Sequence, residues 1–142
     1  METGKMINRI SNRLRRRSHL AQEAIGITGT QGTILDYILI ESATHNIYQK
    51  DIEKEFGLRP STATEVLKTL ERKELICREP DSQDARLKRI VFTPKAASIQ
   101  DQLRTQITET ENLLLTDLTD SEQQEFLRLA KKMLKNLDQQ SL

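Results

Sequence analysis

Near the middle of the chain, one group of charged side chains has a spacing suited to binding a polyanion. Asp84 and Arg86 lie two residues apart and are followed by the basic pair Lys88 and Arg89. A carboxylate at that distance can hold a guanidinium in one orientation, and a guanidinium is attracted by the negative potential of a DNA minor groove. The alternative is an exposed ion pair without a function, which is common on protein surfaces.

A second group of polar side chains falls on a predicted helix just before it. Apolar residues at three- and four-residue spacing, namely Ala63, Val66, Leu67 and Leu70, predict the buried stripe of that helix. The opposite face has short hydroxyls near its start and longer charged groups further along, which suits a helix that enters a major groove. An ordinary solvated helix face is the alternative. The residues of this face are Ser61, Thr62, Thr64, Glu65, Lys68 and Arg72.

The elements around these groups predict how they are positioned. A short amphipathic helix is expected over Gln49–Phe56, and Gly57 can end it because glycine adopts positive φ without steric cost. Pro60 suits the first turn of the next helix, where its missing N–H has no intrahelical partner. The cap of that helix is then Arg59, a poor capping residue, or the helix begins at Ser61 instead.

Two strand-like runs follow this helix and predict a hairpin. The first runs from Leu75 to Arg78, the second from Leu87 to Phe92, and the turn between them, from Glu79 to Ala85, contains Pro80 and two aspartates. We expect Cys77, on the first strand, to be a buried small apolar residue.

The segment from residue 47 to residue 93 thus has the order helix, turn, helix and hairpin. This order, together with Asp84-x-Arg86, the spaced apolar pair Ile90 and Phe92, and Thr93 opening the next helix, resembles the winged helix-turn-helix of the MarR (multiple antibiotic resistance regulator) family of bacterial transcription factors. The length of the chain and its helical flanks fit that family as well, so the resemblance covers nearly all 142 residues.

The resemblance implies a mainly α fold with a small β-hairpin wing. In this interpretation residues 1–142 form one domain, with the DNA-binding unit at 47–93 and dimerisation helices at 1–24 and 94–142. The implied function is a sequence-specific, homodimeric repressor that binds a pseudo-palindromic operator in double-stranded DNA. Relatives often bind small aromatic or phenolic effectors between the dimer helices and the DNA-binding unit, and the corresponding positions here are Arg16, His19 and Leu20.

Three positions depart from the pattern of the family. Glu74 stands where a glycine usually precedes the first wing strand, and Ala96 stands where a glycine often follows the wing. We expect both turns to form without positive φ after a slight backbone shift. Glu65 occupies a position that often holds arginine; a carboxylate there can accept from cytosine N4 but repels phosphates.

The helical flanks carry more apolar surface than a small winged helix can cover. Long apolar stripes are predicted on either side of a capping box at Thr119–Glu122, and burial against a second copy of the chain is the simplest explanation. Thr93 and Pro94 predict one helix start, and Thr28, three residues before Gln31, predicts another. Four arginines crowd the first helix and are expected either to contact phosphate or to pair with the acidic C-terminal helices of a partner; they are Arg13, Arg15, Arg16 and Arg17.

Composition limits the remaining function classes. The net charge is +1, but binding to nucleic acid depends on local patches, so this value does not exclude it. One cysteine, no signal-like apolar run and no stretch long enough to span a bilayer favour a cytoplasmic, disulfide-free protein. Two histidines and one cysteine are too few for a structural zinc centre, and no catalytic or cofactor motif is present, so we expect neither an enzyme nor a metal site.

Two other functions compete with DNA readout. A winged helix can instead dock another protein, which would require an exposed apolar patch on the helix of residues 61–72. Alternatively, Cys77 could make the chain a redox-responsive regulator, although in relatives the reactive thiol lies in the first helix.

Overall fold

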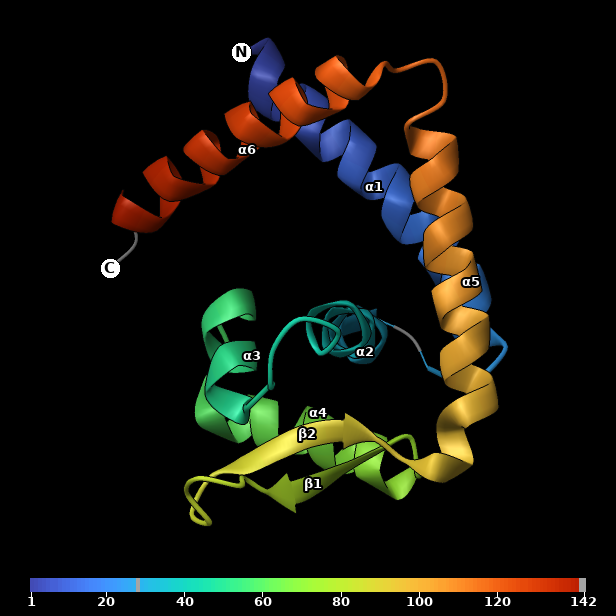
Figure 1. The fold of residues 1–142 in the computed structure, drawn as a ribbon, viewed down its shortest axis with the longest axis vertical. Coiled ribbons are helices and arrows are strands. Elements are labelled where there is room, and N and C mark those ends of the chain that lie inside the picture. The colour runs from blue at the N-terminus through green and yellow to red at the C-terminus, as the bar shows by residue number, and fades with distance from the viewer. Residues whose placement is uncertain (28, 141–142) are drawn as a thin grey trace. The chain divides into compact units, whose positions relative to one another are not determined.

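The computed structural model describes residues 1–27 and 29–140, which form helices and one hairpin (Figure 1). They divide into two compact units, residues 1–108 and 109–142. In chain order the elements are α1 (Glu2–Glu23), α2 (Gly29–Glu41), α3 (Gln49–Phe56), α4 (Pro60–Arg72), β1 (Ile76–Pro80), β2 (Lys88–Phe92), the 3-10 turn η1 (Pro94–Ala96), α5 (Ala97–Leu114) and α6 (Asp120–Gln140). The predicted class, mainly α with a small β-hairpin wing, is confirmed.

The core of the first unit forms around α2. Ile34, Leu35 and Ile38 of this helix are fully buried, and they join Ile52 of α3 and Leu67 of α4 in one apolar cluster. Figure 1 shows α2 nearly end-on, with α3, α4 and the hairpin around it. The two helices that hold the predicted DNA-binding residues therefore rest on the same apolar support.

The hairpin is a two-stranded antiparallel sheet that is longer on its first strand than the sequence predicts. Ile76 pairs with Phe92, and the register continues to Pro80 opposite Lys88. The predicted turn began at Glu79, but that residue still pairs, with Arg89. Proline fits because it lies in the last position of a strand at the edge of a sheet.

Local signals set the boundaries of α3 and α4 as expected. Gly57 has φ 61° and ψ 35°, the left-handed conformation that ends α3. Pro60 is the first residue of α4 and Arg59 is its cap, without a side-chain hydrogen bond. The alternative start at Ser61 is wrong, because extended backbone at Arg59 already leads into a helix that proline can begin.

The predicted caps at Thr93 and Thr119 are present in the structure. Thr93 Oγ1 accepts from the Ala96 N–H at 3.2 Å, and Thr119 and Glu122 form a reciprocal capping box. The proposed cap at Thr28 lies outside the described residues. Among the helices described, none combines the length and the apolar character needed to cross a membrane.

The turn before the first wing strand contradicts our expectation. Glu74 has φ 60°, so the left-handed turn forms here without glycine. Its carbonyl accepts a hydrogen bond from the Thr93 hydroxyl, and its carboxylate lies 3.1 Å from Lys95 Nζ. Because α4 must reverse into β1 over the three residues 73–75, the tertiary structure keeps the conformation and tolerates a strained backbone at Glu74. At Ala96 the expectation is met: the residue is buried and ends the 3-10 turn before α5 without positive φ.

Glu74→Gly is expected to stabilise the protein. A left-handed non-glycine residue costs roughly 1–2 kcal/mol, and the exposed Lys95 ion pair contributes little, so the net gain in unfolding free energy should be about 1 kcal/mol. Urea denaturation measures this gain. Glu74→Gln is the matched control, since it removes the charge but keeps the strain; an equal gain in both variants would assign the effect to charge instead.

Candidate nucleic-acid interface

The outward side of α4 presents five of the six residues predicted for base contact. Ser61, Thr62, Glu65, Lys68 and Arg72 are exposed, whereas Ala63, Leu67 and Leu70 on the other side of the helix are fully buried. Arg72 Nη2 donates to Thr69 Oγ1 at 2.9 Å, which holds the guanidinium along the helix. The exposed side thus combines hydroxyl, carboxylate and cationic groups without an apolar residue.

Thr64, the sixth predicted residue, is turned toward α3. Its hydroxyl donates to the Pro60 carbonyl at 2.8 Å and accepts from Gln49 Nε2 at 3.0 Å. A hydroxyl has one proton to donate, and that proton is already used. The prediction that Thr64 belongs to the contact surface is revised accordingly: its bonds fix the start of α4.

A side chain that the sequence analysis missed links three elements. Gln49, the first residue of α3, donates from Nε2 to the Pro60 carbonyl at 3.2 Å and to Thr64 at the start of α4. Its Oε1 accepts from Arg78 Nη1 of β1 at 3.1 Å, and Arg78 Nε lies 3.1 Å from Glu71 Oε1 near the end of α4. The amide and the guanidinium together bind the wing to both helices of the helix-turn-helix.

The tip of the wing carries the predicted pair of Asp84 and Arg86. Arg86 donates from Nε to Asp84 Oδ1 at 3.2 Å and from Nη2 to Oδ2 at 3.3 Å, while its backbone N–H donates to Oδ1 at 3.0 Å. These hydrogen bonds hold the pKa of Asp84 below its usual range. The Arg86 side chain is nevertheless 91% exposed. The guanidinium is thus oriented by its neighbour and accessible to a partner.

Asp81 organises the base of this tip. Its carboxylate accepts from the Tyr48 hydroxyl and from the backbone N–H groups of Gln83 and Asp84, at 3.0 and 3.2 Å. The Tyr48 bond is the main cause that lowers the pKa of Asp81, and it raises the pKa of Tyr48 in return. The aspartate was recognisable from sequence as turn chemistry, but nothing local indicates that its partner lies at the start of α3.

The two basic residues of the second strand differ. Lys88 is exposed beside the tip. Arg89 is half-buried on the other face of the hairpin and lies 3.0 Å from Glu79 across the strands. Lys88 therefore suits the predicted phosphate contact, whereas Arg89 is already paired within the wing.

Comparison with known proteins agrees with this geometry. The MarR family model matches residues 27–88. S. aureus MepR in its DNA-binding conformation is 28% identical over 94% of this chain and 97% of that chain, with a TM-score of 0.80. The MarR regulator of Oenococcus oeni PSU-1 is 27% identical over 93% of this chain and 98% of that chain, with a TM-score of 0.77.

The chain thus resembles MarR-family transcription regulators in the segment that holds the helix-turn-helix and in its fold. One further similar structure is a complex of S. aureus MepR with DNA, 27% identical over 95% of this chain and 96% of that chain, with a TM-score of 0.76. The fold of this chain is therefore that of MarR-family transcription regulators.

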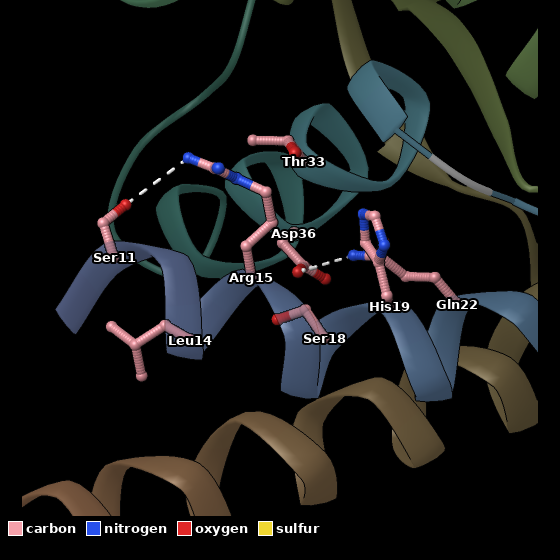
Figure 2. A pocket seen from close by; sticks show the side chains of 8 residues that line it. All are labelled: Ser11, Leu14, Arg15, Ser18, His19, Gln22, Thr33 and Asp36. Carbon is pink, nitrogen blue, oxygen red and sulfur yellow. Dashed lines mark hydrogen bonds between the residues drawn. The ribbon is translucent and has the colours of Figure 1, made fainter. Parts of the chain in front are cut away.

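A cavity of about 210 Å³ between α1 and α2 lies near the expected effector position (Figure 2). Of the three residues predicted for that position, His19 lines it, whereas Arg16 and Leu20 do not and are exposed. Arg16 and Leu20 fall on the opposite side of α1 from the lining residues Ser11, Ser18 and Gln22, because helix residues share a face only at three- and four-residue spacing. The lining residues are Ser11, Leu14, Arg15, Ser18, His19, Gln22, Thr33 and Asp36.

Buried polar groups set the chemistry of this cavity. Gln22 is only 2% exposed and donates from Nε2 to Asp36 Oδ2 at 2.9 Å. Its amide packs against α2 at Gly32, where a Cβ would come within 2.0 Å of Oε1, so a larger residue would displace it. Gln22 Oε1, Asp36 Oδ1 and His19 Nε2 are buried without a hydrogen-bond partner among the described residues. The cavity thus offers acceptors that a donor group could satisfy.

The cysteine is less buried than expected. Cys77 is half-buried, pairs with Val91 in the hairpin and points to the face opposite the buried Ile76 and Ile90. The prediction of a buried small residue is wrong, because the outer face of this two-stranded wing is only partly covered. Within residues 1–27 and 29–140, no three His, Cys, Asp or Glu side chains are grouped as metal ligands would be.

Asp36 is expected to make the stability of this protein rise on mild acidification. Burial raises its pKa from 3.8 to about 6, so the folded state takes up a proton before the unfolded state does. The unfolding free energy should therefore increase as the pH falls from 7.5 to 5 and level off near the unfolded pKa. After discounting for the solvent that still reaches the carboxyl, the gain should be about 1–2 kcal/mol.

Asp36→Asn serves as the comparison for that measurement. The variant keeps an acceptor for Gln22 but carries no charge, so it should be more stable than the wild type at pH 7.5. This difference should narrow as the pH falls to 5 and vanish only below the unfolded pKa of 3.8. Urea unfolding of both proteins at each pH isolates Asp36 from other titrating groups. A constant difference between the two proteins across this range would contradict the assignment.

Proposed function

We propose that this chain is a homodimeric, sequence-specific transcription repressor that binds a pseudo-palindromic operator in double-stranded DNA. The observation that carries the proposal is Arg86, held by Asp84 and almost fully exposed at the tip of a wing that is bonded to α4 through Arg78 and Glu71. A guanidinium fixed in this way suits insertion into a minor groove, while the polar side of α4 suits the adjacent major groove. The MepR–DNA complex supports this use of the fold.

The proposed contacts sort into two kinds. Ser61, Thr62, Glu65 and Lys68 on α4 would read base edges, with Glu65 able to accept from a cytosine N4. Lys88 on the wing and Arg72 at the end of α4 would contact phosphates, which set affinity and salt dependence but not sequence.

Exposed apolar side chains support the proposed dimer. None of the described residues of α6 is buried. Six large apolar residues along this helix are each at least 40% exposed: Phe126, Leu127, Leu129, Met133, Leu134 and Leu137. On α1, Met6 and Ile7 are about half exposed as well. Monomeric proteins rarely leave so many large apolar side chains exposed along a helix, and a two-fold partner would cover them.

A two-fold dimer also gives a reason for a pseudo-palindromic operator. The two copies of α4 would meet successive major grooves about 34 Å apart on the duplex, one helical turn. Because an operator is part of the chromosome, the proposed function places the protein in the cytoplasm.

For relief of repression, we propose the cavity between α1 and α2 as the site of a small aromatic or phenolic effector. A phenolic hydroxyl could donate to the unpartnered Asp36 Oδ1, and the ring could rest on Leu14. His19 is the one residue of the predicted effector set that lines this space.

Protein docking is the weaker candidate. It would require an apolar patch on the exposed side of α4, and the side chains there are polar or charged. A gel shift with random duplex at low salt separates the two functions, since a DNA-binding protein retards such a probe and a protein-docking module does not. The redox alternative rests on Cys77 alone, a half-buried thiol on a wing strand.

Arg86→Ala is expected to weaken operator binding strongly, by about tenfold or more, because an oriented minor-groove guanidinium is removed. The thermal midpoint should stay nearly the same, since the side chain is exposed. Fluorescence anisotropy with an operator selected from random DNA measures the affinity. Arg104→Ala is the control, because Arg104 on α5 also forms an exposed ion pair, with Asp101. Unaltered affinity of the Arg86 variant would remove the wing from the mechanism.

Thr62→Ala and Lys68→Ala are expected to relax the preference among operator variants. Each lost base contact should reduce discrimination at its position by about 1–3 kcal/mol, while binding to random duplex changes less. Competition binding with single-base operator variants measures the discrimination at each position. An equal loss on every sequence would mean that these two side chains touch phosphates and not bases.

A further inference from the structure

The three residues at the start of α3 contact the wing at three points. The Ile47 carbonyl accepts from the Ile90 N–H of β2 at 2.7 Å. The Tyr48 hydroxyl donates to Asp81 at the beginning of the tip, and Gln49 Oε1 accepts from Arg78 of β1. Each contact holds a different part of the hairpin: one strand, the other strand, and the loop between them.

The Tyr48 bond is distinct because of what Asp81 does next. One carboxylate oxygen accepts from Tyr48, and the other accepts from the N–H groups of Gln83 and Asp84. The Asp81 N–H in turn donates to the Leu87 carbonyl at 2.9 Å, and the Leu87 N–H donates to the Asp84 carbonyl at 2.9 Å. Asp81 therefore bonds to both sides of the loop: its carboxylate to residues 83 and 84, and its backbone N–H to Leu87.

Asp84, which this loop positions, is the residue that orients Arg86. A continuous series of hydrogen bonds thus leads from the Tyr48 hydroxyl through Asp81 and Asp84 to the guanidinium. Among the hydrogen bonds of the described residues, the Tyr48 bond alone joins the helical part of the unit to the loop of residues 81–87.

A two-stranded hairpin needs such a support. On its own it is marginally stable in water, and its tip can move relative to the body that carries it. Arg86 can read a groove only if it meets the same base step each time, since a narrow minor groove extends over a few A·T pairs. The position of the tip relative to α4 therefore affects selectivity as well as affinity.

We propose that Tyr48 is a positioning residue for the wing, whose hydroxyl acts through Asp81 to set where Arg86 meets the minor groove. The inference rests on the proposed operator binding and adds to it a residue that would touch no DNA. Minor-groove selectivity at the flanks of the operator would then depend on a hydroxyl at the start of α3. Base discrimination by α4 would not depend on it.

Tyr48→Phe tests the proposal, because it removes the hydroxyl and keeps the ring. Affinities are measured for the selected operator with A·T flanks, for the same operator with G·C flanks, and for an operator with a central mismatch under α4. The wild type should prefer A·T flanks. The variant should lose about fivefold to tenfold on A·T flanks, keep its affinity on G·C flanks, and keep the full penalty for the central mismatch.

Two controls separate positioning from general damage. Tyr37→Phe also removes a phenolic hydroxyl, from a residue of α2 that packs edge-on against Phe56, and should leave flank preference unchanged. Asp81→Ala should lose at least as much as Tyr48→Phe, because it also removes the acceptor of the Gln83 and Asp84 N–H groups. The double variant should lose no more than Asp81→Ala alone, because the Tyr48 hydroxyl acts through Asp81.

Hydrogen exchange of the free protein gives a readout that needs no DNA. The backbone N–H groups of Gln83 and Asp84 donate to Asp81, so in Tyr48→Phe they should exchange faster than in the wild type. The amides of α2 and α4 should keep their protection. A merely structural role would raise exchange throughout the unit.

The outcomes are distinguishable. Wild-type flank preference in Tyr48→Phe would overturn the inference and leave the proposed function intact. Equal losses on all three operators, with faster exchange in α2 and α4, would also overturn it, because the hydroxyl would then support the fold and not the wing. If the wild type selected no sequence at all, the proposed function would fail, and the positioning role would fail with it.

Discussion

The arrangement of the reading surfaces depends on the hydrogen bonds of one side-chain amide. Gln49 donates toward the start of α4 and accepts from Arg78 on the wing, so a single group fixes both surfaces relative to α3. An amide can do this because it carries two donors and an acceptor at fixed angles. Thr64 and Glu71 complete the network from α4. Without it, the bonds of Ile47 and Tyr48 would still hold β2 and the loop, but β1 would lose its bonds to α3 and α4 at Arg78.

The wing is a case in which function and stability make different demands. Its outer face is only partly covered, Cys77 is half-buried, and the turn that starts it holds Glu74 in a strained left-handed conformation. Such a two-stranded element gains little from burial, so directional bonds at Ile47, Tyr48 and Gln49 replace a larger core. The tip remains exposed, as groove insertion requires.

The contact between α1 and α2 shows a similar compromise. Gln22 is a buried polar residue bonded to the partly buried Asp36, and the missing side chain at Gly32 provides the space for the amide. Burial shifts the pKa of Asp36 to about 6, which means that its charge costs stability at neutral pH. Two apolar residues would pack better here. The polar cluster instead leaves unpartnered acceptors beside a cavity, an arrangement suited to a binding site.

The sequence by itself determined the features that depend on near neighbours. The bounds of α3, the left-handed Gly57, the start of α4 at Pro60, the capping box at Thr119 and the pairing of Asp84 with Arg86 all involve residues within four positions of one another. Periodicity identified the buried side of α4, and the order of elements pointed to the family. These signals are local, so they survive without knowledge of the fold.

Only the tertiary structure decided which polar groups meet across the chain. Tyr48 and Asp81 are 33 positions apart, and Gln49 and Arg78 are 29 apart, so neither pair has a local signature. The same holds for Thr64, which looked like a contact residue until α3 was placed beside it, and for Glu74, whose φ follows from the path between α4 and β1. A polar side chain on a helix has many potential partners, and only packing selects among them.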